Sequence, residues 1–312
     1  MELIRGLHNL RPHHRGCVVT IGAFDGVHRG HQAVLRSLMA KGQELGLPSV
    51  VVVFEPLPRE YFSPLDAPPR LMSFREKFVA LAELGIDRLL RVRFDERLRR
   101  TSPRQFVEEV IAGGLGARFV LVGDDSRFGR DRGGDEELLR AGGERFGYSV
   151  AATSTVLEGS ERISSTRIRE ALGAARFEEA ERLLGRPYSI TGRVVTGKQL
   201  GRQLGAPTAN IQLRRIRAPL NGVYAVQVQG VEAGRCWPGV ANIGVRPTVG
   251  DLVQAVLEVH LFDFSGDIYR RKLTVQFRHK LRDEIKFESL AALQAQIQCD
   301  FHEGRRLLGL NP

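Results

Sequence analysis

Short apolar runs alternate with helical patterns over residues 16–184. The runs at 17–21, 50–54, 89–92, 119–122 and 148–152 are apolar enough to be buried strands. Between them, apolar residues recur with helical spacing near 31–45, 73–85, 102–112 and 135–142. Near-continuous apolar strands that alternate with helices are typical of a parallel sheet covered on both faces. This half of the chain is therefore predicted to be a doubly wound α/β domain.

The pattern changes after a helical segment at 176–184, which is followed by Gly185 and Pro187. Strand patterns then follow one another at 188–195, 223–228, 240–243, 256–262 and 273–277, with turn residues between them. Such a series predicts an antiparallel barrel or sandwich. A terminal helix follows, whose stripe of Leu290, Leu293, Ile297 and Phe301 is expected to pack on the barrel. The predicted domains are 1–185 and 186–312.

Composition adds a basic surface to this picture. The 312 residues include 46 Lys and Arg against 36 Asp and Glu, which gives a net charge of +10. The basic residues are mostly arginines scattered among acidic ones, so they indicate a solvated surface first, a surface that attracts anionic nucleotides second, and polynucleotide binding third. We expect no membrane span and no secretory leader, because no apolar run approaches the roughly 18 residues of a span. Three separated cysteines favour the cytoplasm over a disulfide framework.

The strongest local signal is the segment from Thr20 to His31, TIGAFDGVHRGH. A buried strand runs into a glycine-rich turn, and a helix is predicted to begin near Gly30. The carboxyl end of a parallel strand is where ligands bind in such sheets, and glycines with a helix N-terminus suit a phosphate. His28 and His31 are three apart and can point the same way. Two alternatives compete: a metal site, which lacks a third ligand, and a purely structural histidine.

This segment resembles the HxGH motif of the nucleotidyltransferase superfamily. Its longer pattern, GxFDGxHxGH, resembles the motif in the adenylyltransferase half of bacterial bifunctional riboflavin kinase/FAD synthetases. The resemblance implies a Rossmann-like nucleotidyltransferase domain. It also implies that His28 and His31 stabilise the ATP phosphates as pyrophosphate leaves. The other nucleotide-binding residues implied in this turn are Gly22, Phe24, Asp25 and Gly30.

Three further segments support the same resemblance. Phe54 to Arg59 resembles FxPxPR and implies flavin contacts for Pro56 and Pro58, although a stiff proline loop is the plainer interpretation. Residues 123–129 resemble GxDFxFG and imply that Asp125 binds the nucleotide, with Ser126 in place of the aromatic residue. Residues 163–169 match SSTxIR, so the implied phosphate ligands are Ser165, Thr166 and Arg167. Hydroxyls there would also cap a helix.

The second half carries its own glycine-rich segment. Residues 192–198 nearly spell a Walker motif, but Gln199 replaces the required Ser or Thr and the segment lies among strands, so we reject that interpretation. Residues 197–210 instead resemble the riboflavin kinase motif GxxxGxxxGFPTAN, with Ala206 in place of Phe. The resemblance implies ATP binding by Gly197, Gly201, Gly205 and Pro207. It implies Mg²⁺ binding by Thr208 and Asn210, whose side chains share one face of an extended segment.

Later strands complete the second site. With a period of two, Glu258 and His260 share one face of a strand, while Leu257, Val259 and Leu261 share the other. The resemblance implies that Glu258 is the general base for the ribityl hydroxyl of riboflavin, although a lone strand glutamate is more often simply solvated. Arg282, near the terminal helix, is implied to contact the isoalloxazine ring. Arg270 departs from the glycine of the family's DLYG motif.

The resemblance spans about residues 16–308, with several motifs in each half. It implies a riboflavin kinase barrel that makes FMN and an α/β domain that makes FAD, with ATP, riboflavin and FMN as small-molecule substrates and Mg²⁺ as cofactor. It implies no nucleic-acid or membrane partner, and nothing in the sequence specifies an oligomeric state. Two alternatives remain at this point: an adenylyltransferase whose barrel only binds flavin, and a basic nucleic-acid-binding protein.

Overall fold

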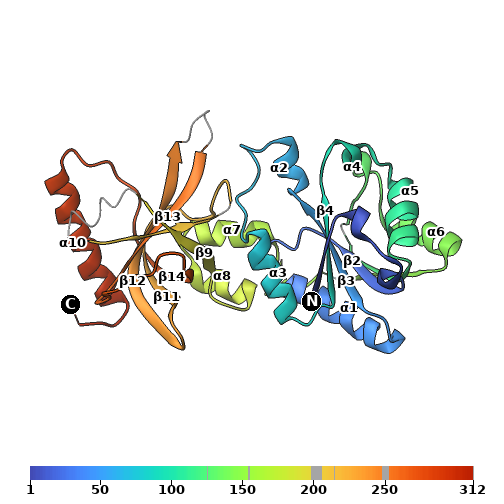
Figure 1. Ribbon diagram of the computed structural model, residues 1–312, viewed down its shortest axis with the longest axis horizontal. Coiled ribbons are helices and arrows are strands. Elements are labelled where there is room, and N and C mark those ends of the chain that lie inside the picture. The colour runs from blue at the N-terminus through green and yellow to red at the C-terminus, as the bar shows by residue number, and fades with distance from the viewer. Residues whose placement is uncertain (125, 154, 198–205, 214, 248–252, 312) are drawn as a thin grey trace. The chain divides into compact units, whose positions relative to one another are not determined.

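Figure 1 shows the computed structural model of the chain, which describes all residues except 125, 154, 198–205, 214, 248–252 and 312. The contacts divide the chain into two compact units. The first comprises Met1–Pro68 and Phe74–Ser164, and the second comprises Pro69–Ser73 and Ser165–Pro312. None of the described helices is long and apolar enough to span a bilayer.

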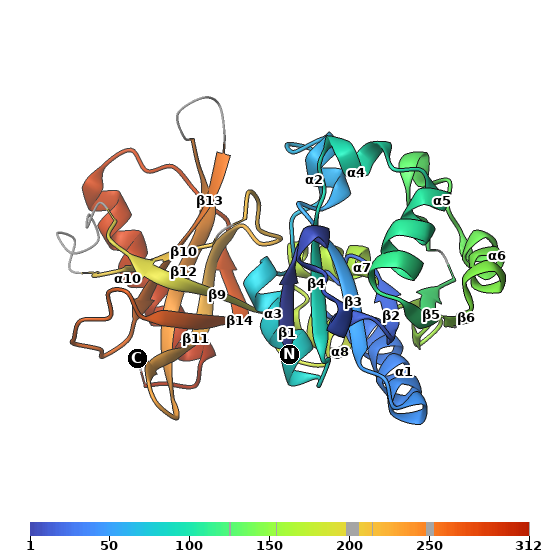
Figure 2. The same ribbon diagram turned by 45° about the vertical axis from the view of Figure 1, so that its right-hand side comes forward.

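The first unit is built on a six-stranded sheet in the order β1-β4-β3-β2-β5-β6, and all its strand pairs are parallel. Figure 2 shows its strands side by side. They are β1 (Glu2–Arg5), β2 (Cys17–Ile21), β3 (Ser49–Glu55), β4 (Arg88–Arg93), β5 (Ala117–Gly123) and β6 (Ser149–Thr153). A short hairpin of β7 (Leu157–Glu158) and β8 (Glu161–Arg162) stands apart from the sheet.

Helices connect these strands and cover the sheet. They are α1 (Arg29–Leu45), α2 (Pro58–Phe62), α3 (Phe74–Glu83), α4 (Glu96–Arg100), α5 (Pro103–Phe106) with the π-helix Val107–Gly114 that continues it, and α6 (Glu136–Phe146). Short 3₁₀ turns lie at Leu7–Asn9, Pro12–His14 and Arg130–Arg132. Successive residues of β2 belong to two different hydrophobic clusters. Val19 is in one cluster with Phe106 and Leu139, and Val18 is in another with Leu38. The expected two-sided coverage of a doubly wound sheet is confirmed.

The position of β2 explains where a ligand can bind in this sheet. β2 pairs with β3 on one side and with β5 on the other, so the strand order reverses direction around β2. In open parallel sheets the crevice at such a reversal, at the carboxyl ends of the strands, is the usual ligand site. The glycine turn after Ile21 begins at this point.

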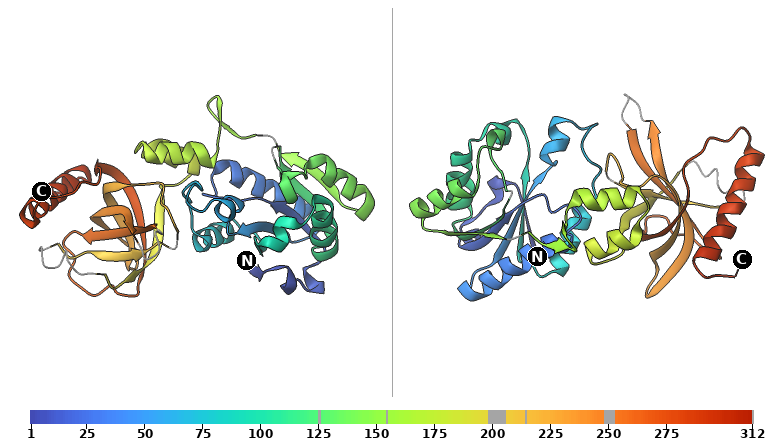
Figure 3. Two further views of the ribbon diagram at one scale, coloured as in Figure 1. Left: turned by 90° about the horizontal axis from the view of Figure 1, so that it is seen from above. Right: turned by 180° about the vertical axis from the view of Figure 1, so that it is seen from behind.

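The second unit is built on a closed barrel in the order β10-β13-β12-β11-β14-β9, with all neighbours antiparallel. The strands are β9 (Ser189–Val195), β10 (Ala209–Gln212), β11 (Gly222–Glu232), β12 (Arg235–Pro247), β13 (Val253–Leu261) and β14 (Lys272–Arg282). Helices α7 (Ser165–Gly173) and α8 (Phe177–Leu184) precede the barrel, and α10 (Leu290–Leu307) follows it. Both views in Figure 3 show α10 along the outside of the barrel.

A short stretch of the N-terminal half also belongs to the second unit. Leu71 is fully buried, and its carbonyl accepts hydrogen bonds from the Tyr188 hydroxyl and the Arg215 guanidinium, at 3.2 Å each. The chain therefore leaves the first unit after Pro68 and returns to it at Phe74.

All the expected strands are present, and the barrel form is the correct alternative of the two. The expected apolar stripe of the terminal helix is only partly right. Leu290 is 63% exposed, whereas α10 packs on the barrel through Phe301 and Leu308, which join Val240 and Phe262 in one cluster. The first residues of the helix, 290–292, are all exposed, so periodicity alone overstates how much of the stripe is covered.

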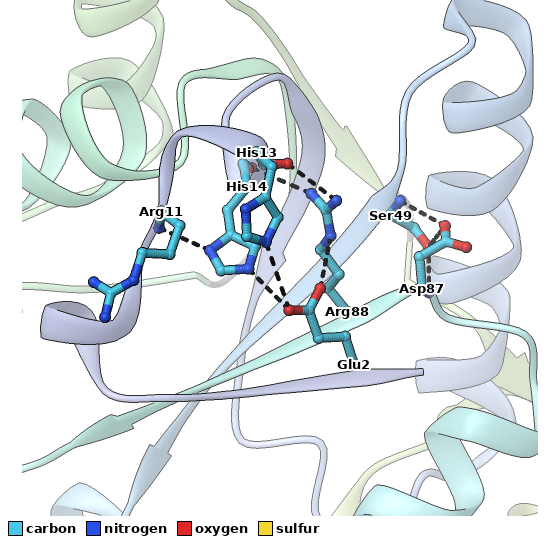
Figure 4. Close-up of polar contacts among 7 residues, drawn as sticks. All are labelled: Glu2, Arg11, His13, His14, Ser49, Asp87 and Arg88. Atoms are coloured by element: carbon cyan, nitrogen blue, oxygen red, sulfur yellow. Dashed lines mark hydrogen bonds and ion pairs between the residues drawn. The ribbon is translucent and has the colours of Figure 1, made fainter.

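The first strand is held by a polar cluster around Glu2, which Figure 4 draws. One Glu2 oxygen lies 2.9 Å from His14 Nε2 and 4.0 Å from His13 Nε2, and the other lies 3.3 Å from Arg88 Nε. His14 Nδ1 accepts the Arg11 amide hydrogen at 2.9 Å, so the neutral ring carries its proton on Nε2 and donates it to Glu2. A protonated Nε2 and a neighbouring guanidinium suit a polar clasp rather than a metal site.

This clasp makes a testable contribution to stability. The hydrogen bond from His14, helped by the charge of Arg88, holds the pKa of Glu2 below its usual 4.5. The ionised carboxylate therefore stabilises the folded state above about pH 4.5, and this contribution is lost as the pH falls through the lowered pKa. Glu2→Gln should make the amide hydrogens of β1 exchange faster than in wild type at pH 7. The free energy of opening should fall by no more than about 1 kcal/mol, because the Glu2 side chain is 47% exposed. The difference should shrink as the pH falls from 7 through the lowered pKa of Glu2; a difference that does not change with pH would contradict an ionic clasp.

Candidate active sites in the two units

The turn between β2 and α1 has a tightly constrained backbone. Phe24, Gly26 and Val27 have φ values of 46°, 87° and 41°, in the left-handed region. A β-carbon at Gly22 would lie 3.0 Å from the Phe24 ring, and one at Gly30 would lie 3.2 Å from the His28 ring. The glycines therefore let two rings lie directly against the backbone of the turn.

His28 and His31 form one stacked pair at the start of α1. Their ring centroids are 3.5 Å apart with an interplanar angle of 18°. His28 is the N-cap of the helix, and its Nδ1 accepts the His31 amide hydrogen at 3.2 Å. The neutral His28 ring therefore carries its proton on Nε2. The expectation that both histidines point the same way is confirmed.

His31 is uncharged in this environment. Burial is the main cause, and the adjacent His28, Lys77 and Arg162 add to it, so the pKa of His31 lies well below its usual 6.5. His31 Nδ1 is buried and has no hydrogen-bond partner among the described residues. His31 therefore offers a neutral imidazole, in which one nitrogen donates a hydrogen bond and the other accepts one.

The positive charge near His31 comes from residues that the sequence did not single out. Lys77 on α3 is almost fully buried, and its Nζ lies 3.9 Å from the Glu55 carboxylate at the end of β3. Arg162 on β8 lies 3.7 Å from Asp124, which follows β5. Lys77, Glu55, Arg162 and Asp124 come from separate parts of the chain, and nothing in their local sequence marks them; only the fold of the first unit forms these two ion pairs.

The other site residues predicted for the first half lie in three segments: the glycine turn, the loop after β3 and helix α7. Phe24 and Asp25 are buried in the turn itself. Pro56 is exposed and follows a cis peptide bond, and Pro58 begins α2. The residues of the SSTxIR motif lie on α7 in the second unit; they are Ser165, Thr166 and Arg167. Asp125 lies outside the described residues.

The SSTxIR segment begins where the chain passes from the first unit, at Ser164, into the second unit, at Ser165. The carbonyl of Ile163, just before the motif, lies 3.5 Å from where a β-carbon would stand at Gly30. Arg167 Nε donates to Glu179 of α8 at 3.2 Å, so part of its guanidinium is held inside the second unit. Its predicted role at the ATP phosphates stays a prediction.

In the barrel, the strand register brings three polar residues into one row. Glu258 on β13 lies directly opposite Asn210 on β10 and opposite Asn242 on β12. Opposite residues of antiparallel strands project from the same face, with β-carbons about 5 Å apart. Leu257 and Val259 are buried, whereas Glu258 is partly exposed, so the row lies on the outer face as the period of two predicts.

Asn210 also contacts the glycine-rich segment. A β-carbon at Gly197 would overlap the Asn210 carboxamide, so a side chain at 197 would require Asn210 to move. Gly201 and Gly205 lie outside the described residues. Ala206 is buried, and Pro207 and Thr208 are exposed just before β10 begins at Ala209. Thr208 and Asn210 thus flank the inward-facing Ala209, as expected.

A cavity of about 740 Å³ lies in the barrel unit, where Ala209, Val259 and Leu261 line it rather than the residues of the polar row. Pro207 and Thr208 line it on one side, and the loop after β13 lines it with Phe264, Asp267 and Tyr269. The mixture of apolar rings, a hydroxyl and a carboxylate is typical of small-molecule sites. Of the predicted kinase residues, this cavity contains Pro207 and Thr208.

Arg282 is engaged with the terminal helix. Its guanidinium forms a two-point ion pair with Asp300 of α10, with hydrogen bonds of 2.8–3.1 Å, and lies over the Phe287 ring at 5.7 Å. Asp300 is 6% exposed and also accepts a hydrogen bond from Gln296. The contact between Arg282 and the isoalloxazine stays a prediction.

Comparisons with known proteins assign a family to each half. A family model described as FAD synthetase matches residues 10–167, and one described as riboflavin kinase matches residues 184–308. A parallel-sheet unit with a phosphate-type glycine turn and a barrel with its own polar site thus define a two-domain flavin-nucleotide enzyme.

Relatives match the chain over almost its whole length. Bifunctional riboflavin kinase/FMN adenylyltransferases from Pseudomonas fluorescens and Escherichia coli strain K12 are 55% and 48% identical, over 98% and 99% of this chain and of their own length. A crystal structure described as a macrolide-efflux protein from Streptococcus pneumoniae superposes with a TM-score of 0.75 at 30% identity, covering 96% of this chain and 97% of that one. The chain belongs to the family of bifunctional riboflavin kinase/FMN adenylyltransferases.

Proposed function

We infer that this chain carries out two successive transfers. The barrel unit moves the γ-phosphoryl group of ATP to riboflavin, which gives FMN and ADP. The α/β unit then moves AMP from a second ATP to the FMN phosphate, which gives FAD and pyrophosphate. The observation that carries this conclusion is the presence of both family domains in one chain, together with relatives of 48–55% identity that span it.

We propose that the histidine pair serves the adenylyl transfer. A phosphate oxygen of FMN attacks the α-phosphorus of ATP, the bond to the bridging oxygen breaks, and charge accumulates on the departing pyrophosphate. The Nε2–H of His28 and a ring N–H of the neutral His31 can donate hydrogen bonds to that charge, supported by the helix N-terminus. Lys77 and Arg162 supply fixed positive charge nearby. Gly22, Phe24, Asp25 and Gly30 shape the turn around the phosphates.

We propose that Glu258 is the general base of the phosphoryl transfer. Its carboxylate takes the proton of the ribityl hydroxyl as that oxygen attacks the γ-phosphorus and ADP leaves. The register places Asn210 directly beside it, and Thr208 lies two residues earlier on the same face. Their neutral oxygens fit Mg²⁺, which commonly combines one or two protein ligands with phosphates and water. When bound, the ion supplies charge neutralisation at the β- and γ-phosphates.

The cavity beside Thr208 is the proposed place for the nucleotide of the kinase reaction. Gly197, Gly201, Gly205 and Pro207 are the proposed phosphate contacts, and Arg282 the proposed flavin contact. We further propose that the catalytic halves are 1–185 and 186–312. ATP, riboflavin and FMN are then the partners, without nucleic acid or membrane, and the cytoplasm is the compartment. The free thiols of Cys17, Cys236 and Cys299 suit that compartment.

A direct test of the function is incubation of the purified chain with riboflavin and Mg-ATP. We expect FMN to form first and FAD to follow. If the barrel only bound flavin, no FMN would form from riboflavin, although supplied FMN would still become FAD.

The proposed metal role of Thr208 has its own test. Thr208→Val keeps the shape of the side chain but removes its oxygen, so the Mg²⁺ concentration for half-maximal riboflavin phosphorylation should rise roughly tenfold, as expected for loss of one interaction with a charged group. Thr208→Ser is the matched control and should stay near wild type. FAD formation from supplied FMN should not change in either variant. An unshifted Mg²⁺ dependence in Thr208→Val would remove Thr208 from the metal site.

A further inference from the structure

We propose that His260 is a positioning residue of the kinase site, which holds the segment Pro207–Thr208 in the conformation that receives the magnesium–nucleotide complex. The inference rests on the proposed metal role of Thr208. His260 lies on β13, two residues after Glu258, and belongs to the same outer face of the barrel.

A hydrogen bond links the His260 ring to the backbone of the nucleotide segment. His260 Nδ1 lies 2.9 Å from the carbonyl oxygen of Pro207. A carbonyl can only accept, so the proton of the imidazole stands on Nδ1. Burial, opposed by this hydrogen bond, lowers the pKa of His260 below its usual 6.5, which keeps the ring neutral. The ring is thus a fixed donor aimed at the peptide unit immediately before Thr208.

The terminal helix supports one face of the His260 ring. His260 stacks on Phe301 of α10, with centroids 4.2 Å apart and an interplanar angle of 14°, and meets the Phe262 ring edge-on at 5.9 Å. The neighbouring residue Asp300 is tied to Arg282 by the two-point ion pair. Phe301 itself packs against buried Val240 and Phe262, so the imidazole stacks on a ring that the barrel supports.

The hydrogen bond from His260 lies next to the proposed metal ligand Thr208. Thr208 is exposed and precedes the first residue of β10, so the barrel ladder does not fix it. The hydrogen bond to Pro207 fixes the adjoining peptide unit instead. Val259 and Leu261, on either side of His260, line the same cavity as Pro207 and Thr208. A ligand held on a loosely supported segment loses precision, so such supporting contacts commonly decide how well a metal or phosphate is bound.

Two substitutions separate the hydrogen bond from the stacking. His260→Phe keeps an aromatic ring on Phe301 but removes the donor. His260→Asn places an amide N–H near the position of Nδ1 and removes the ring. We expect His260→Phe to raise the Mg²⁺ requirement and the KM for ATP of riboflavin phosphorylation about fivefold, the typical effect of one lost hydrogen bond, with a smaller change in kcat. His260→Asn should restore both constants to within about twofold of wild type.

The controls distinguish failure of this inference from failure of the proposed metal role. FAD formation from supplied FMN and an unchanged thermal midpoint report a folded chain; if His260→Phe does not fold, His260→Leu replaces it as the variant without a donor. Unchanged constants in a folded variant without the donor, or equal losses in that variant and in His260→Asn, would overturn the positioning role. Thr208→Val is titrated in parallel: if it shifts the Mg²⁺ requirement and His260→Phe does not, only the His260 inference fails. If Thr208→Val has no effect, the metal role itself fails.

Discussion

FAD formation should stop in the double variant His28→Ala/His31→Ala, while FMN continues to accumulate from riboflavin. The stacked imidazoles are proposed to donate hydrogen bonds to the departing pyrophosphate. Loss of one such preorganised donor typically costs about 10²–10³-fold, so loss of both should abolish measurable adenylyl transfer. The barrel has its own polar row and its own cavity, so riboflavin phosphorylation should be unaffected. Chromatography of riboflavin, FMN and FAD in one reaction measures both effects.

A matched pair of histidines provides the control for this variant. His8 and His13 lie in the same unit, are exposed and do not belong to the glycine turn, so His8→Ala/His13→Ala should make FAD at the wild-type rate. If the folded His28/His31 variant made FAD as fast as this control, the histidine pair would have no role in the transfer.

Riboflavin phosphorylation should fall by about 10²–10⁴-fold in Glu258→Gln, the usual contribution of a positioned general base. Glutamine keeps the size of the side chain and can still accept a hydrogen bond from the ribityl hydroxyl, but it does not take up the proton. Riboflavin binding should therefore remain close to wild type. FAD formation from supplied FMN should continue, because that step is assigned to the other unit.

Glu288 offers the comparison for this substitution, since it is an exposed carboxylate in the same unit and outside the polar row. Glu288→Gln should leave both activities intact. A solvated strand glutamate at 258 would behave in the same way, so equal kinase rates in the two variants would exclude the general-base role.

The fold was largely predictable from the sequence because most of its strands coincide with recognisable apolar runs. The near-continuous apolar runs of β2, β3 and β5 predict a sheet buried on both faces, and the structure has one. Strand β10 was predicted only as an extended segment, since four residues carry little periodic signal. The exposed first turn of α10 was not predictable, because a stripe of apolar residues does not say where its supporting surface ends.

The candidate sites were predictable only as far as they are local in sequence. The shared direction of His28 and His31 follows from their spacing of three, although their stacking does not, and the shared outward face of Thr208 and Asn210 follows from strand alternation. The register that places Asn210 beside Glu258 required the barrel to close. The buried charge of Lys77 and the lowered pKa of His31 depend on packing between distant elements, which no motif records.

The central claim is that two chemically separate sites, around His28–His31 and around Glu258, make FMN and FAD in turn. The most direct test is a time course of riboflavin, FMN and FAD with Mg-ATP for wild type, His28→Ala/His31→Ala and Glu258→Gln under identical conditions. We predict that wild type forms FMN and then FAD, that the histidine variant stops at FMN, and that Glu258→Gln leaves riboflavin unconverted yet turns supplied FMN into FAD. Failure of the folded histidine variant to form FMN, failure of folded Glu258→Gln to convert supplied FMN into FAD, or wild-type formation of both products in either variant would contradict the assignment of separate sites.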